Sequence, residues 1–153
     1  MKKVGGDFVS MPIKDLIKPI VRVPYSLNIA SVAVTMTLNK IQCVLVDHFD
    51  GSLGIITEKD IIREVVARCR DASLVRAWEI MKQPVITADE EIDMHDAIEI
   101  MRQCKIRNLV ITRGEEILGV VKRSTILNNI KFEEEDYWTA GKENLIQKEQ
   151  SIH

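Results

Sequence analysis

The stretch LGIITEKDII, Leu53–Ile62, is the part of the sequence on which the interpretation of the chain depends. An apolar run ends at Thr57, Gly54 lies inside that run, and Asp60 follows three residues after the threonine. A threonine before a helix and an acidic residue at its third position can form a capping box, in which each side chain bonds the other residue's backbone N–H. The same residue types at a helix start also suit the phosphate and ribose of a nucleotide. The rest of the chain has to distinguish these two roles.

The region around this stretch recurs once, 65 residues farther along the chain. Residues 13–65 align with residues 78–130 without a gap, and the apolar pattern stays in step throughout. Because a repeated unit is a supersecondary building block, the chain is predicted to contain two copies of one fold. The identical pairs are Pro19/Pro84, Met36/Met101, Lys40/Lys105, Ile41/Ile106, Leu53/Leu118, Gly54/Gly119 and Ile61/Ile126.

Each copy predicts the element order β-α-β-β-α after a short helical lead-in. The pattern alternates between extended apolar runs and stretches with helical periodicity. Asp50-Gly51 is a strong hairpin signal in the first copy, and Gly114 marks the bend in the second. The predicted ranges in the two copies are 19–23 and 84–88 (strand), 26–40 and 90–105 (helix), 43–46 and 108–111 (strand), 53–56 and 117–121 (strand), and 58–69 and 123–130 (helix).

The size of each copy predicts how the two copies are arranged. About 60 residues bury too little surface to be comfortably stable alone. We therefore expect an α/β (α+β) protein whose two repeats pack sheet to sheet with pseudo-two-fold symmetry. The repeats are assigned to residues 10–70 and 74–131. Residues 132–153 are expected to form an acidic and then polar tail. It is either a frayed tail or a short helix that docks through Tyr137 and Trp138, or else a peptide that binds a partner.

Composition excludes several classes of protein. The chain has 153 residues, 46% hydrophobic and 29% charged, with a formal net charge of −2. This near-neutral charge does not fit a nucleic-acid-binding protein. No apolar run reaches the roughly 18 residues of a membrane-spanning helix, and the N-terminus lacks the apolar region of a signal peptide. We expect a cytoplasmic protein that does not bind membranes.

The reactive residue types do not predict an enzyme or a metal site. The cysteines are far apart, so we expect reduced thiols, some of them buried in the core. The histidines have no spacing typical of zinc ligands, and the chain has no nucleophile–base pair and no Gly-rich P-loop. These residues are Cys43, Cys69 and Cys104, and His48, His95 and His153.

The duplicated pattern and its motifs resemble a pair of CBS domains, also called a Bateman module. The resemblance covers about residues 10–130. In the first repeat it is carried by CVLVD (43–47), by the hairpin Asp-Gly and by GIITEKD (54–60). The second repeat contributes MKQPVIT (81–87), DAIEIM (96–101), KIRNLVI (105–111) and LGVV (118–121). The resemblance implies a regulatory module that binds adenine nucleotides or adenosyl compounds in clefts between the repeats and commonly forms dimers.

The resemblance also implies which residues contact the ligand. The G-x-x-[ST]-x-x-D segment of one repeat would supply ribose and phosphate contacts, and the other repeat would form the base pocket. Repeat 1 would contribute Ile55, Thr57, Lys59 and Asp60, and repeat 2 would contribute Met81, Gln83, Pro84, Val85, Ile106 and Arg107.

Physical chemistry suggests a role for several of these residues. Thr57 and the free N–H groups of the first helical turn form a potential anion site, and the carboxylate of Asp60 suits a ribose diol. Val85 and Ile106 would sandwich a purine. Arg107 has the planar fork that binds phosphate bidentately, although it is equally well explained as a solvated surface charge. Met81 fits a core position better than a ligand contact, and Lys82 and Lys105 are expected to be plain surface charges.

The second repeat departs from the motif. Lys122 and Thr125 occupy the positions of Thr57 and Asp60, so the second cleft lacks the expected ribose acceptor. A helix is still predicted there, with Ser124 as a possible cap. We expect one competent cleft per chain, although Lys122 and Arg123 could still hold a phosphate.

Two functions remain open from the sequence. The first is a homodimeric sensor that binds AMP, ADP or ATP, or alternatively NAD or S-adenosylmethionine, and signals occupancy to a separate regulated protein. The second is a degenerate CBS pair that serves as a dimerisation scaffold without a ligand. No obligatory cofactor, metal or catalytic residue is expected. Retention of the complete G-x-x-T-x-x-D set favours the sensor.

Overall fold

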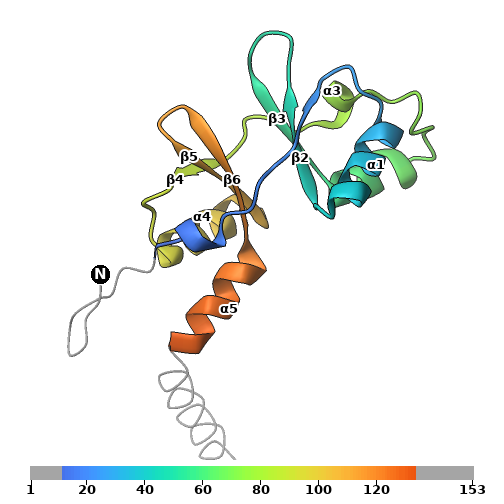
Figure 1. Cartoon of the computed structure of the whole chain (residues 1–153). Helices are drawn as coiled ribbons and strands as arrows, with labels where there is room; N and C mark the ends of the chain where they lie inside the picture. The colour runs from blue at the N-terminus through green and yellow to red at the C-terminus, as the bar shows by residue number, and fades with distance from the viewer. Residues whose placement is uncertain (1–11, 134–153) are drawn as a thin grey trace, which may run out of the picture. The chain divides into compact units, whose positions relative to one another are not determined.

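The computed structural model describes residues 12–133 and shows a mixed α+β protein (Figure 1). The predicted order β-α-β-β-α occurs twice, each time after a short helical lead-in, which confirms the fold class. The first repeat comprises the 3₁₀ helix η1 (Lys14–Leu16), β1 (Arg22–Pro24), α1 (Ile29–Asn39), β2 (Cys43–Asp47), β3 (Leu53–Thr57), α2 (Glu58–Ile61) and the π-helical turn η2 (Ile62–Val66). The second comprises α3 (Ala77–Ile80), β4 (Thr87–Asp89), α4 (Met94–Cys104), β5 (Asn108–Arg113), β6 (Glu116–Lys122) and α5 (Arg123–Glu133).

The strands form two three-stranded sheets, in the orders β1-β2-β3 and β4-β5-β6. In the first sheet β1 runs parallel to β2, and β2 pairs with β3 in the antiparallel sense. In the second sheet β4 runs parallel to β5 in the same way. A parallel pair needs a crossover connection, which α1 and α4 provide.

The repeat spacing of 65 residues is preserved at the helix ends. Asn28 caps the start of α1 and Asp93 caps the start of α4, each through a side-chain oxygen that accepts a backbone N–H. Lys40 and Lys105 end these helices in the left-handed conformation, at φ 53° and 56°. Because both ends of both helices coincide with the alignment, the two copies share their backbone geometry as well as their apolar pattern.

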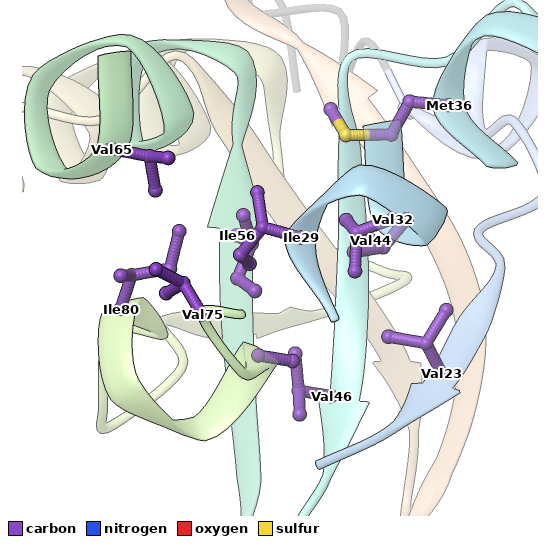
Figure 2. Packing of buried hydrophobic residues seen from close by; sticks show 11 residues of the cluster. Val23, Ile29, Val32, Met36, Val44, Val46, Ile56, Val65, Val75 and Ile80 are labelled. Atoms are coloured by element: carbon purple, nitrogen blue, oxygen red, sulfur yellow. The ribbon is translucent and has the colours of Figure 1, made fainter. Parts of the chain in front are cut away.

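One face of the first sheet is covered by helices (Figure 2). Side chains alternate between the faces of a strand, and Val44 and Val46 of β2 face the helical side. Leu45, which points the other way, is also fully buried, so both faces of β2 are covered. The cluster on the helical side comprises Val23, Ile29, Val32, Met36, Val44, Val46, Ile56, Val65, Val75, Ala77 and Ile80.

The two closing helices differ from the sequence prediction. In the first repeat the helix widens after Ile61 into the π-helical turn η2, where the N–H of Ala67 donates to the carbonyl of Ile62 (2.8 Å). In the second repeat α5 begins at Arg123, so the predicted cap at Ser124 is wrong. The start at Arg123 agrees with the predicted range 123–130, so Ser124 lies inside the helix, and the N–H of Arg123 donates to the carbonyl oxygen of Arg107 (2.8 Å).

The described chain divides into two compact units whose limits differ from those of the repeats. One unit comprises residues 17–89 and 110–120, and the other comprises residues 12–16, 90–109 and 121–133. The packing of the two sheets on one another stays a prediction. The tail predicted at 132–153 lies outside the described residues beyond the last turn of α5. Within residues 12–133, no helix has both the length and the hydropathy needed to cross a membrane.

Candidate functional site

Thr57 and Asp60 form a complete capping box at the start of α2. Thr57 has an extended backbone (φ −109°, ψ 165°) and ends β3. Its N–H and its hydroxyl both donate to Oδ2 of Asp60, at 2.9 and 3.0 Å, and its Oγ1 accepts the N–H of Asp60 at 3.3 Å. The T-x-x-D sequence therefore has the helix-capping role that the sequence offered as one of its two interpretations.

Asp60 is also the one buried charged residue among the residues whose burial is described. Its side chain is only 7% exposed. The cap uses Oδ2 alone, while Oδ1 lies 3.5 Å from Nζ of Lys82. A buried carboxylate is costly unless hydrogen bonds and an opposite charge compensate it. Here Thr57 supplies the hydrogen bonds and Lys82 supplies the charge, so capping leaves one carboxylate oxygen for a second partner.

The first backbone N–H of α2 is not free for an anion. The N–H of Glu58 donates to the carbonyl oxygen of Gln42 (3.1 Å), as the N–H of Arg123 does to Arg107 in the second repeat. Because these pairs occupy equivalent positions, the contact belongs to the fold itself. The anion site expected from free N–H groups is thus smaller than the sequence suggested.

The segment after α3 lies along the edge of β3. Lys82 and Ile55 exchange two backbone hydrogen bonds, at 2.9 and 3.0 Å. The half-buried side chain of Met81 covers Gly54, where an added Cβ would lie 2.5 Å from the methionine sulfur. Gly54 therefore makes room for Met81, and this contact agrees with the core position that the sequence favours for Met81.

Gln83 links the segment after α3 to the hairpin between β2 and β3 through hydrogen bonds. Its Nε2 donates to Oγ of Ser52 (2.9 Å) and to the carbonyl oxygen of Leu53 (3.1 Å). The hydroxyl and the N–H of Ser52 donate in turn to Asp50, and these bonds hold the pKa of Asp50 well below its usual value. The amide of Gln83 thus has a structural role, whether or not it also contacts a ligand.

The structure brings together only part of the predicted site. Ile55, Thr57, Asp60, Met81 and Gln83 belong to one network of contacts around the edge of β3. Three further members lie in the same unit: Lys59 and Pro84 are exposed, and Val85 is half-buried. The last two lie in the other unit, where Ile106 is half-buried and Arg107 is exposed. The purine sandwich and the phosphate contact of Arg107 stay predictions.

Sequence reasoning missed the role of Lys82, because it predicts a plain surface charge at this position. The ion pair with Asp60 follows from the backbone pairing of residues 82 and 55, which places the lysine beside the end of β3. The one hint in the sequence was that Lys82 directly precedes the Gln83-Pro84 segment, which the resemblance assigned to the site. A lysine in a short connection has no periodic neighbours, so residue spacing could not predict its ion pair with Asp60.

The second repeat has a related arrangement without the carboxylate. Lys18 and Val120 exchange two backbone hydrogen bonds of 2.9 Å, so the lead-in lies along β6. Gly119 there has φ +154°, and an added Cβ would overlap the carbonyl oxygen of Lys18. Thr125 takes the place of Asp60, is half-buried, and uses its carbonyl oxygen to accept from Asn129 (2.8 Å). This half of the fold therefore keeps the frame of the first site but lacks its acid.

The described part of the chain has no group of three or more His, Cys, Asp or Glu side chains that could hold a metal ion. The three cysteines are not joined in disulfides; Cys43 is buried, and Cys69 and Cys104 are exposed.

Comparison with known proteins places the chain in a family. The CBS domain matches it twice, at residues 13–67 and 77–131. Uncharacterized protein MK0525 of Methanopyrus kandleri is 35% identical over 85 residues, which is 55% of this chain and 43% of that protein. Uncharacterized protein MJ0450 of Methanocaldococcus jannaschii is 30% identical over 115 residues, 72% of this chain and 60% of that protein. The chain thus spans about half the length of these relatives.

A solved structure supports the same assignment. The hexameric CBS-CP12 protein from bloom-forming cyanobacteria is 25% identical, with a TM-score of 0.75 over 90% of this chain and 86% of that one. Its fold agrees with the two three-stranded sheets described above. The chain belongs to the CBS-domain family and carries two CBS domains in tandem.

Proposed function

We propose that this protein is a regulatory module that binds an adenine nucleotide or adenosyl compound and signals its occupancy to a separate protein. The observation that carries the proposal is the buried carboxylate of Asp60, held by Thr57 through one oxygen and offering the other. CBS domains are generally regulatory rather than catalytic, which supports the same class of function.

The geometry supports a role for Asp60 as an acceptor for ribose hydroxyls. The hydrogen bonds from Thr57 fix the carboxylate in one orientation, so little conformational freedom remains to be lost when a ligand binds. A hydroxyl that reaches Oδ1 would receive a charge-assisted hydrogen bond, which is stronger than a neutral one. Thr125 offers no such acceptor in the second repeat, so we propose one site per chain.

The first test compares wild type with Asp60→Asn in titrations with AMP, ADP, ATP, NAD and S-adenosylmethionine. The asparagine oxygen can still accept the N–H of Thr57, whereas the amide nitrogen replaces the free oxygen. One ligand should stabilise wild type by about 2.7 kcal/mol at a hundredfold excess over Kd, which shifts the thermal midpoint by several degrees. Isothermal titration calorimetry should show at least a tenfold weaker affinity for Asp60→Asn.

Asp93→Asn is the matched control. It makes the same chemical change at the start of α4, where Asp93 caps the helix by accepting the N–H of His95 (2.9 Å). This variant should bind the ligand as wild type does. Absence of any response in wild type, up to millimolar ligand, would reject the sensor and leave the scaffold as the better function.

The scaffold alternative is favoured by exposed apolar side chains on two helical segments of the first repeat. Val34 and Leu38 of α1 are 56% and 77% exposed, and Ile62 and Val66 of η2 are 58% and 65% exposed. Each pair has the i, i+4 spacing that places side chains on one face of a helix. Groups of exposed apolar side chains mark protein–protein interaction sites. We propose that a second copy of the chain covers these residues in a homodimer.

The dimer is tested with the double variant Leu38→Glu, Val66→Glu. Burying two new carboxylates without partners is costly, so the variant should be monomeric at micromolar concentration in size-exclusion chromatography with light scattering, while wild type is dimeric. Leu74→Glu is the control, because Leu74 is 72% exposed but lies outside both helices; this variant should stay dimeric. A double variant that remains dimeric would place the interface elsewhere.

A further inference from the structure

Lys82 is the charged residue that pairs with Oδ1 of Asp60, the oxygen that the helix cap does not use. Its Nζ lies 3.5 Å from Oδ1, and its side chain is 63% exposed while that of Asp60 is 7% exposed. The pair thus joins a buried, fixed carboxylate to an ammonium group that extends into solvent. Only the lysine end of this pair is accessible to solvent.

The anchoring of each partner differs in the same way. Asp60 is held by the two hydrogen bonds from Thr57. The backbone of Lys82 is paired with Ile55, so its side chain starts at a defined point, and most of that side chain is exposed to solvent. A lysine ammonium is a compact charge with rotatable donors, and 3.5 Å is longer than the 2.7–2.9 Å of a strong charge-assisted bond. The contact is therefore easily exchanged for another anion.

We propose that Lys82 reads the phosphate of the ligand. In the structure its ammonium pairs with Oδ1 of Asp60. When ribose hydroxyls take that oxygen, the ammonium turns to the 5′-phosphate of the same ligand, which is the nearest anion that the ligand brings. The site consequently selects phosphorylated adenosine over adenosine and over adenosyl compounds that carry no phosphate.

This inference rests on the proposed function, and it adds a charge argument to it. Asp60 alone would repel a phosphate through its negative charge, because like charges raise the free energy of a shared site. Lys82 balances the carboxylate in the structure. With the ligand bound it would offset part of the phosphate charge, while hydrogen bonds from Thr57 and from the ribose hydroxyls stabilise the carboxylate. A site with Asp60 but without Lys82 would suit a neutral or cationic adenosyl compound better.

The test measures AMP and adenosine binding to wild type and to Lys82→Met by calorimetry. Wild type should bind AMP at least tenfold more tightly than adenosine. In Lys82→Met the affinity for AMP should fall about tenfold, the size expected for one hydrogen bond to a charged group. Adenosine affinity should be unchanged or slightly higher, since the ligand no longer displaces the ammonium from Asp60. Lys82→Arg, which keeps the charge, should retain part of the preference for AMP.

Lys18→Met is the matched control. Lys18 occupies the comparable place in the other lead-in, with its backbone paired to Val120, and within residues 12–133 it has no ion pair. Both affinities should stay at their wild-type values in this variant. The inference is overturned if Lys82→Met still prefers AMP to adenosine. It is also overturned if wild type binds adenosine without preferring AMP. Either result leaves the proposed function standing. Wild type that binds neither compound and no other adenosyl ligand overturns both.

Discussion

Gly119→Ala should destabilise the protein strongly, and by more than the equivalent change in the first repeat. The backbone of Gly119 has φ +154°, which side chains rarely adopt, and the new Cβ would overlap the carbonyl oxygen of Lys18 and lie 2.8 Å from Cγ2 of Ile17. That carbonyl cannot move away alone, because it accepts the N–H of Val120 (2.9 Å). Backbone strain and the lost pairing together should cost about 3 kcal/mol.

Gly54→Ala is the internal comparison, because the two glycines are equivalent in the repeats. The three atoms nearest to its Cβ would all belong to the side chain of Met81, with the sulfur at 2.5 Å, and methionine has three rotatable bonds with which to withdraw. We expect a loss of about 1–2 kcal/mol, typical of overpacking. Urea denaturation of both variants measures the difference. Equal losses of unfolding free energy in the two variants would show that the backbone beside β6 shifts as readily as a methionine side chain.

These two glycines show where the repeat alignment was sufficient and where it failed. The alignment predicted the shared elements because apolar periodicity and hairpin residues are local signals, and the caps at Asn28 and Asp93 confirm its register. It could not show that Gly54 faces a side chain while Gly119 faces a backbone carbonyl. That difference arises from how each lead-in lies along its strand, which depends on contacts distant in the sequence.

The candidate site was predictable to a similar degree. The T-x-x-D spacing gave both the cap and the acid, since a capping box and a ribose acceptor require the same residues at a helix start. The partner of the second carboxylate oxygen was not predictable, because Lys82 reaches Asp60 through a backbone pairing with Ile55. The π-helical turn after Ile61 was also missed, because the apolar pattern of IIREVV fits an ordinary helix equally well.

Asp60→Ala should lower the free energy of unfolding by about 2 kcal/mol even when no ligand is present. The substitution removes the acceptor of the Thr57 N–H and hydroxyl, and it leaves Lys82 without its carboxylate. Loss of a helix cap costs about 0.5–2 kcal/mol, and a buried donor without an acceptor adds to this cost. Chemical denaturation of ligand-free protein is the measurement, with Thr57→Ser as a control that keeps the hydroxyl and should lose much less.

The effects of Thr57→Ala and Asp60→Ala should not add. Both substitutions break the same reciprocal bonds, so the double variant should be more stable than the sum of the two single losses predicts, by about 1 kcal/mol. Additive losses would mean that the box contributes nothing as a unit.

Because Asp60→Ala weakens the fold itself, its effect on a thermal-shift titration mixes lost stability with lost binding. Asp60→Asn keeps an acceptor for Thr57, so it should be more stable than Asp60→Ala. If the two variants lose ligand affinity equally, one carboxylate oxygen serves the cap and the other binds the ligand.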